Sequence, residues 1–92
     1  MIAMSIKSVA DELEQFIRET FHVTDDDELF TRHVHLYQEG YVDSVGVVET
    51  IAHLEQTWAV SIPPTAVFDP LFTHIDGMAR YIVALKEQAA AS

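Results

Sequence analysis

The residue best placed to do chemistry is Ser44, which stands where a polar loop gives way to an apolar pattern of helical period. It lies between an acid, Asp43, and an aliphatic residue, Val45, in the stretch Gly40-Tyr41-Val42-Asp43-Ser44-Val45. The start of a helix leaves backbone N–H groups unpaired and carries partial positive charge, so it can bind a phosphate ester. These features favour a serine that carries a covalently tethered group over a catalytic serine.

Two other kinds of site fit the sequence less well. A serine hydrolase places its nucleophile in a Gly-x-Ser-x-Gly turn between a strand and a helix. Ser44 instead has glycine four residues before it and two residues after it, and no strand is evident.

His33 and His35 could bring two imidazoles together, but no second close pair completes a tetrahedral metal site. The acidic run 25–28 lacks the spacing and the glycine of a calcium-binding loop. We interpret two further histidines as residues of helix surfaces: His53 and His74.

Composition limits the class of protein. The 92 residues suffice for one domain, residues 1–92, with a core from about residue 5 to about residue 87. Fifteen acids against five Lys and Arg give a net charge of −10, which repels nucleic acid and favours partners with basic docking patches. Because cysteine is absent, any thioester chemistry would need a thiol from a cofactor. The sequence has neither a signal peptide nor a membrane-spanning run, so we expect a cytoplasmic protein without membrane insertion.

Three segments show helical periodicity and predict the long helices that position Ser44. The first follows a cap at Ser5 or Ser8, and its inward face holds Ile6, Val9, Leu13, Phe16 and Ile17, with Phe21 at the edge. The second runs from about Ser44 to Trp58, with Val47, Val48, Ile51, Leu54 and Trp58 turned inward. The third runs from about Thr73, a candidate cap with Asp76, to Lys86, and its inward residues are Ile75, Met78, Ala79, Ile82 and Leu85.

The connections between these helices complete the predicted fold. A loop of roughly twenty residues, from Phe21 to Asp43, is long enough to need anchors, which we expect to be Leu29, Phe30, Leu36 and Tyr37. After Pro63-Pro64, residues Thr65 to Phe68 are expected to form one short helix. Trp58 and the five phenylalanines are expected in the core. The prediction is an all-α protein with three long helices and one short helix.

Two stretches around Ser44 carry a resemblance to a known family. Leu36-Tyr37-Gln38-Glu39-Gly40-Tyr41-Val42-Asp43-Ser44-Val45-Gly46-Val47-Val48-Glu49 resembles the phosphopantetheine attachment region of acyl and peptidyl carrier proteins. Leu54-Glu55-Gln56-Thr57-Trp58-Ala59-Val60-Ser61-Ile62-Pro63 is similar to the part of that family where the second helix ends. The resemblance extends over almost the whole chain in helix order, loop length and size, and it implies the four-helix bundle of carrier proteins.

The resemblance implies a non-catalytic carrier. Ser44 would receive 4′-phosphopantetheine from coenzyme A through a magnesium-dependent phosphopantetheinyl transferase, and the thiol of that group would hold an acyl or aminoacyl group as a thioester. The other implied partners are an adenylating acyl or aminoacyl ligase and synthase enzymes. We expect the free protein to be a monomer. The rival interpretation is a small acidic helical interaction module without a prosthetic group.

A docking face beside Ser44 is predicted from the helical pattern together with the resemblance. Val45, Glu49, Ala52 and Gln56 lie opposite the predicted core residues of the second helix. Single exposed valines are common in proteins, but the resemblance favours contact with partner enzymes. The predicted docking residues are Asp43, Val45, Glu49, Ala52 and Glu55, of which Glu55 lies nearest the core edge.

Two positions depart from the pattern of fatty-acid carriers. Val45 replaces the more usual leucine, and Gly46 stands where those carriers usually have an acid. With Gly46 at this position, the sequence is similar to that of D-alanyl carrier proteins and of other free-standing aminoacyl or peptidyl carriers. The resemblance therefore implies an amino acid or a small carboxylic acid as the cargo. A glycine in the first turn also lowers helix propensity. Either Asp43 or Ser44 could cap this helix, and we favour Asp43 because Ser44 would then keep a free hydroxyl.

Overall fold

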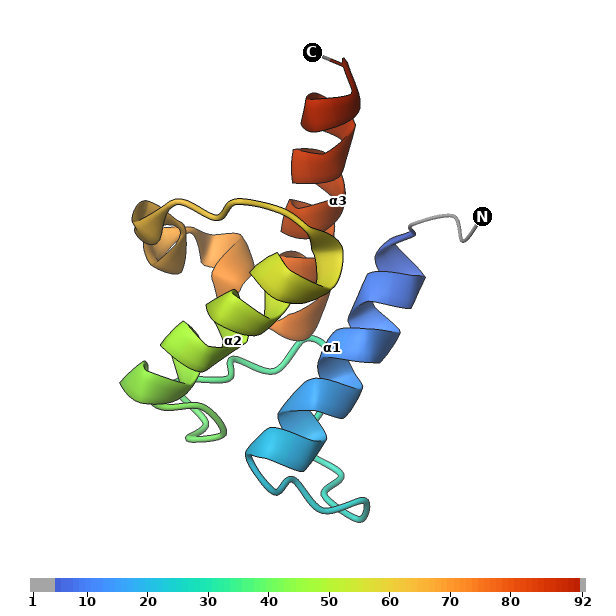
Figure 1. The fold of residues 1–92 in the computed structure, drawn as a ribbon. Coiled ribbons are helices and arrows are strands. Elements are labelled where there is room, and N and C mark those ends of the chain that lie inside the picture. The colour runs from blue at the N-terminus through green and yellow to red at the C-terminus, as the bar shows by residue number, and fades with distance from the viewer. Residues whose placement is uncertain (1–4, 92) are drawn as a thin grey trace.

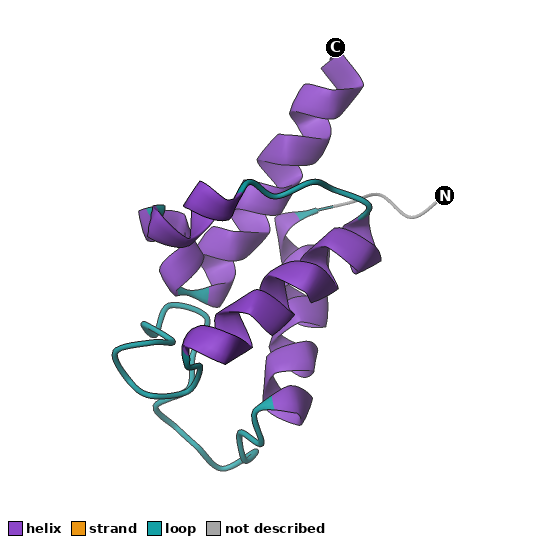
Figure 2. Cartoon of the chain, turned by 60° about the vertical axis from the view of Figure 1, so that its left-hand side comes forward, coloured by secondary structure: helices purple, strands orange, loops and turns teal. Residues whose placement is uncertain are grey.

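The structure is a computed structural model that describes residues 5–91. Its α-helices are α1 (Ile6–Thr20), α2 (Ser44–Trp58) and α3 (Ile75–Ala91), and two 3₁₀ helices, η1 (Pro64–Phe68) and η2 (Pro70–Thr73), lie between α2 and α3. α1 packs against α3, and η2 packs against the first part of α3 (Figure 1). The long loop between α1 and α2 runs below the helices (Figure 2). The all-α prediction agrees with these elements.

The short helix predicted at Thr65–Phe68 is present as the 3₁₀ helix η1, and a second 3₁₀ helix, η2, follows it, which was not predicted. Pro64 begins η1 and Pro70 begins η2. Proline disfavours helical backbone in the residue before it, and Asp69 is extended, with φ −74° and ψ 131°. The segment therefore turns twice over a short distance and cannot continue as one helix.

The core is built mainly from α1 and α3, as their periodicity predicts. Ser5 caps α1 and forms a capping box with Ser8, so the two candidate caps act together. Leu85, Ile6, Phe16 and Phe21 pack against the core but are only partly buried. The buried residues of the two helices are Val9, Ala10, Leu13 and Ile17 from α1 and Ile75, Met78, Ala79 and Ile82 from α3.

The buried stripe of α2 differs from the predicted one. Its buried residues are Gly46, Thr50 and Leu54, four residues apart, whereas Val48 is 66% exposed, contrary to prediction. Glycine and threonine are not counted as apolar in a hydropathy pattern. The pattern therefore predicted a buried stripe that included Val48 and left out Gly46 and Thr50. Thr50 is buried without an unpaired hydroxyl, because its Oγ1 donates to the Gly46 carbonyl oxygen at 2.8 Å.

Backbone and side-chain bonds hold the long loop on the helices. Leu36 N–H donates to the Thr73 carbonyl at 2.8 Å, and Asp76 N–H donates to the Arg32 carbonyl at 2.9 Å. Phe30 and Leu36 are buried and Tyr37 is partly buried, as predicted for anchors. Leu29 was predicted as a fourth anchor, but it is 77% exposed, because its place in a turn closed by Asp27 Oδ1 directs its side chain outward.

The start and end of α3 also differ from prediction. Thr73 is the last residue of η2 and not the cap of α3, because its Oγ1 donates to the Pro70 carbonyl at 2.8 Å. α3 begins at Ile75 and continues to Ala91, past the predicted end at Lys86, through a run of alanines that favour helix. Within residues 5–91, no helix has the length and apolar content needed to cross a membrane.

Three aromatic or histidine predictions are corrected by the structure. Phe68 was expected in the core but is 85% exposed. His53 was expected at the helix surface, but its ring stacks on Phe16 at a centroid distance of 3.8 Å, and its Nε2 lies 2.8 Å from Glu12 Oε2. His74 is half-buried and lies just before α3 instead of on a helix surface.

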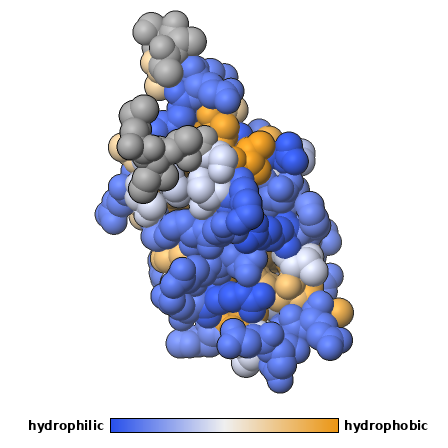
Figure 3. Space-filling model, turned by 90° about the vertical axis from the view of Figure 1, so that its right-hand side faces the viewer, coloured by the Kyte–Doolittle hydropathy of each residue, from blue (hydrophilic) through white to orange (hydrophobic). Residues whose placement is uncertain are grey.

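The face of the molecule seen in Figure 3 is mostly hydrophilic.

Candidate functional site

Asp43 is the residue that caps α2. Its backbone is extended, and its Oδ1 accepts a hydrogen bond from Gly46 N–H at 2.7 Å. Ser44 is the first residue of α2, its side chain is exposed, and its Oγ makes no hydrogen bond to any part of residues 5–91. The favoured alternative for the cap is confirmed, and the Ser44 hydroxyl is free to react.

A tight turn before α2 delivers Ser44 to the surface. Gly40 has φ 79°, a left-handed conformation that glycine adopts without strain. The N–H groups of Tyr41 and Val42 then both donate to the Leu36 carbonyl, at 2.9 Å and 3.1 Å. Because Leu36 and Val42 are buried, this turn fixes the start of α2 on the core.

Two tyrosines hold this turn through their hydroxyl groups. Tyr41 donates to Asp27 Oδ2 at 3.0 Å, and Tyr37 donates to the Phe72 carbonyl. Burial raises the pKa of Tyr37. Partial desolvation raises the pKa of Tyr41, and the Asp27 carboxylate adds to this effect. Both hydroxyls therefore stay protonated as hydrogen-bond donors at neutral pH.

Gly46 is packed too closely for a side chain. A Cβ at this position would lie 2.7 Å from Phe21 Cε1 and 3.0 Å from Val42 Cγ1. The glycine thus lets the end of α1 approach the first turn of α2. A larger residue at position 46 would require the Phe21 ring to shift.

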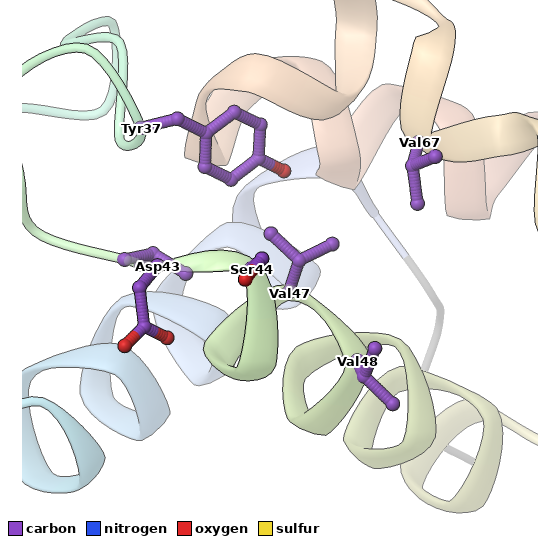
Figure 4. Close-up of a pocket in the computed structure, with 7 residues that line it drawn as sticks. Tyr37, Asp43, Ser44, Val47, Val48 and Val67 are labelled. Atoms are coloured by element: carbon purple, nitrogen blue, oxygen red, sulfur yellow. The ribbon is translucent and has the colours of Figure 1, made fainter.

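A pocket of about 550 Å³ adjoins Ser44. Figure 4 shows Ser44 and Val47 at its centre, with Val48 farther along α2, and Tyr37 and Val67 on the other side. The Tyr37 hydroxyl is already bonded to Phe72, so the walls offer mainly apolar contacts. The residues that line the pocket are Tyr37, Val42, Asp43, Ser44, Val47, Val48 and Val67.

This pocket contains residues that the sequence did not point to. Val48 was predicted in the core but is exposed and lines the pocket, and Val47 lines the pocket while it also packs against the core. The pair of valines one turn after Ser44 was the available signal. Val67 lies about twenty residues further on, and no local pattern in the sequence connects it with Ser44.

Four of the five predicted docking residues lie at the surface near Ser44. Val45 is 65% exposed, and Asp43, Glu49 and Ala52 are exposed as well. Glu55 differs, because it is half-buried and its Oε2 accepts a hydrogen bond from Ile62 N–H at 3.0 Å. Glu55 therefore ties the end of α2 to the chain that follows and is not part of the exposed group.

The two histidines of the long loop, His33 and His35, contact different neighbours. His33 is exposed and its ring lies 6.3 Å from that of His74, whereas His35 Nδ1 accepts a hydrogen bond from Gln38 N–H. In the part of the chain that the structure describes, no group of three or more His, Asp or Glu residues is arranged to hold a metal ion.

Comparison with known proteins identifies the family. No curated protein matches this chain in sequence. The family described as phosphopantetheine attachment site matches residues 11–82, a span that contains the long loop, α2 and both 3₁₀ helices. Because the match covers well over half of the 92 residues, the chain belongs to the phosphopantetheine attachment family.

Proposed function

We propose that this protein is a carrier that holds an acyl or aminoacyl group on a 4′-phosphopantetheine arm attached to Ser44. The observation that carries the proposal is the free, exposed hydroxyl of Ser44 at the first residue of α2. Membership of the family implies covalently attached 4′-phosphopantetheine, and domains of this family are generally non-catalytic. Ser44 is thus the site of modification by a partner enzyme.

The residues around Ser44 fit the prosthetic group. The Asp43 carboxylate accepts a hydrogen bond from the Gly46 N–H alone. The other N–H groups of the first turn therefore remain available to a phosphate. The apolar walls formed by Val47, Val48 and Val67 can contact the arm beyond the phosphate. When bound, the group supplies a thiol that carries the cargo as a thioester, while the chain itself contributes only attachment and contacts.

The proposed cargo is an amino acid or a small carboxylic acid, loaded by an adenylating ligase. Gly46 supports this proposal, because its packing against Phe21 leaves no room for the acid that fatty-acid carriers usually have there.

Intact-protein mass after incubation with coenzyme A, magnesium and a broad-specificity phosphopantetheinyl transferase tests the attachment site. We expect the wild type to gain one phosphopantetheinyl group and Ser44→Ala to gain none. Ser44→Ala should keep the wild-type helicity, because an exposed hydroxyl contributes little to packing. The matched control is Ser61→Ala, which removes another exposed serine and should be modified normally.

Modification of the Ser44→Ala protein would refute the site. If a folded wild type gains no mass with either of two transferases, the rival function is favoured, in which the acidic helical surface binds proteins without a prosthetic group.

Partner enzymes are proposed to dock on the exposed part of α2 beside Ser44. Glu49 lies one turn after Val45, is exposed, and makes no ion pair within residues 5–91. We predict that Glu49→Lys slows transfer to Ser44, because the new charge repels a basic partner surface. Glu87→Lys makes the same charge change at an exposed site of α3 and should have a smaller effect. Equal rates for wild type and Glu49→Lys at low salt would contradict the docking face, provided that circular dichroism shows equal helicity.

A further inference from the structure

One histidine joins α2 to α1. His53, in the second half of α2, lies with its ring nearly parallel to that of Phe16 of α1, at a centroid distance of 3.8 Å and an interplanar angle of 12°. Its Nε2 lies 2.9 Å from Glu12 Oε1 and 2.8 Å from Glu12 Oε2, so one ring atom contacts both oxygens of the carboxylate. We call these three residues the α1–α2 clasp: Glu12, Phe16 and His53.

The clasp matters because α2 is otherwise weakly tied to the other helices. The closely packed pairs of elements are α1 with α3, α3 with η2, and η1 with η2, and α2 belongs to none of them. Among residues 5–91, no other hydrogen bond or ion pair joins α2 to α1 or α3. Glu55 is bonded to the chain that follows α2, at Ile62 N–H. Loss of the clasp should therefore loosen α2 while the core between α1 and α3 stays intact.

The charged groups nearest His53 are carboxylates. Glu12 faces the ring from α1, and the exposed Glu49 lies one turn before it on α2. The cations of α1, Lys7 and Arg18, are paired with other acids. Within the described residues, His53 makes no hydrogen bond, ion pair or ring contact with α3 or the long loop. The strength of the clasp therefore depends on the charge of the imidazole itself.

Protonation of the imidazole strengthens both contacts of the clasp. Histidine is the side chain whose charge ordinarily changes between about pH 5 and pH 8. A hydrogen bond between charged groups is stronger than one between neutral groups, and a cation is attracted to the face of an aromatic ring. A neutral His53 can still donate one hydrogen bond to Glu12, so the clasp weakens at higher pH without being lost.

We propose that the α1–α2 clasp is a pH-sensitive device that holds α2 tightly against α1 when His53 is protonated and more loosely when His53 is neutral. Ser44 is the first residue of α2, so the clasp also steadies the helix that presents its hydroxyl to a partner enzyme. A loosened helix must be ordered again on binding, which weakens the complex. His53 is thus a positioning residue. The effect on Ser44 rests on the proposed function, whereas the effect on α2 does not.

Hydrogen exchange of the unmodified protein at about pH 6 and about pH 8 tests the clasp. The variants are His53→Gln, Glu12→Gln and the double variant, and the measured quantity is the protection factor of the α2 amides, which corrects for the intrinsic exchange rate at each pH. At the lower pH, we expect each single variant to lower α2 protection about fivefold and the double variant to lower it little further. At the higher pH, the loss should be about twofold, and α3 protection should change less at both pH values.

Two further variants serve as controls. His53→Arg keeps a cation at both pH values that can stack on Phe16 and pair with Glu12, so α2 should stay protected at both. His22→Asn removes an exposed histidine that makes no hydrogen bond, ion pair or ring contact among residues 5–91. Asparagine tolerates the positive φ of 58° at this position, so His22→Asn should behave like wild type.

Kinetics of phosphopantetheine transfer from coenzyme A connect the clasp with Ser44. We expect KM of His53→Gln to be about threefold above wild type at the lower pH and close to wild type at the higher pH, with little change in kcat. His53→Arg should restore the wild-type KM at the lower pH. A role of His53 in stability alone would not produce this difference between the two pH values.

The outcomes separate the clasp from the proposed function. Equal α2 protection in wild type and His53→Gln would overturn the clasp, and so would an equal loss of protection in α2 and α3. A loss of the same size at both pH values would overturn its pH sensitivity. Altered α2 protection with an unchanged KM would overturn the effect on Ser44. A wild type that is never modified would refute the carrier function, while the exchange data would still decide whether the clasp exists.

Discussion

Gly46 shows how a single residue can have several roles at the start of a helix. Its N–H donates a hydrogen bond to the capping Asp43 carboxylate, and its carbonyl accepts one from the Thr50 hydroxyl. The Phe21 ring occupies the space where a side chain at this position would begin. From the sequence, glycine at this position indicated a weaker helix and a lost docking charge. The structure adds that the missing side chain leaves space for the ring of Phe21, the C-cap of α1, beside the first turn of α2.

Gly46→Ala is predicted to destabilise the protein by about 1 kcal/mol, because overpacking exceeds the gain in helix propensity. In a Phe21→Ala background, the same substitution should cost less, since of the close contacts only that with Val42 Cγ1 at 3.0 Å remains. Urea unfolding of the four proteins measures both effects in one double-mutant cycle. A stabilising Gly46→Ala in the wild-type background would contradict the close contact.

The elements of the fold are joined by polar contacts as well as by the core. On α1, Glu12 and Phe16 hold His53 of α2. Arg32 of the long loop reaches Asp11 at 2.5 Å and Glu14 at 2.9 Å, and its carbonyl accepts Asp76 N–H of α3. The loop is therefore clamped between α1 and α3, which steadies the turn that leads to Ser44.

The Arg32 clamp is predicted to make stability depend on pH. Hydrogen bonds from Lys7 and Arg32 lower the pKa of Asp11, and the Arg32 guanidinium lowers the pKa of Glu14. A carboxyl group with a lowered folded-state pKa stabilises the fold above its unfolded-state pKa, and this contribution disappears as pH falls through the folded-state pKa. Arg32→Gln should therefore cost more stability at about pH 7 than at about pH 3.

Urea unfolding at the two pH values checks this expectation. The control is Lys86→Gln, which removes a cation that makes no ion pair within residues 5–91 and should show a smaller change with pH. An equal cost of Arg32→Gln at both pH values would show that the side chain acts through packing alone.

At the scale of the whole molecule, charge and apolar exposure are distributed unevenly. The paired cations belong to α1, the long loop and α3, whereas residues 33–79 contain six acids and no Lys or Arg, and of these acids Asp76 is paired with Arg80. The exposed Val48 lines the same pocket as Ser44, and Val45 and Phe68 are exposed as well. This arrangement gives the molecule one side suited to basic partners, while its core is formed chiefly by α1 and α3.

The sequence predicted those features that depend on local patterns. The inward faces of α1 and α3 follow from apolar residues at helical spacing, and the candidate site follows from Asp43 and Ser44 directly before such a pattern. The sequence limited the N-cap of α2 to Asp43 or Ser44, because few residue types have side chains that accept hydrogen bonds from the first turn of a helix. These predictions need only neighbours within a few positions.

Tertiary structure alone decided the features that depend on distant contacts. Gly46 and Thr50 are buried because Phe21 and the core approach that side of α2, which exposes Val48. The expected short helix forms as η1, a second 3₁₀ helix follows it, and Val67 of η1 meets α2 only after the chain folds back. The sequence by itself determined the long helices and the position of Ser44 at the start of one of them, because periodicity and capping are local. Which side chains surround that serine was decided by packing between segments far apart in the chain.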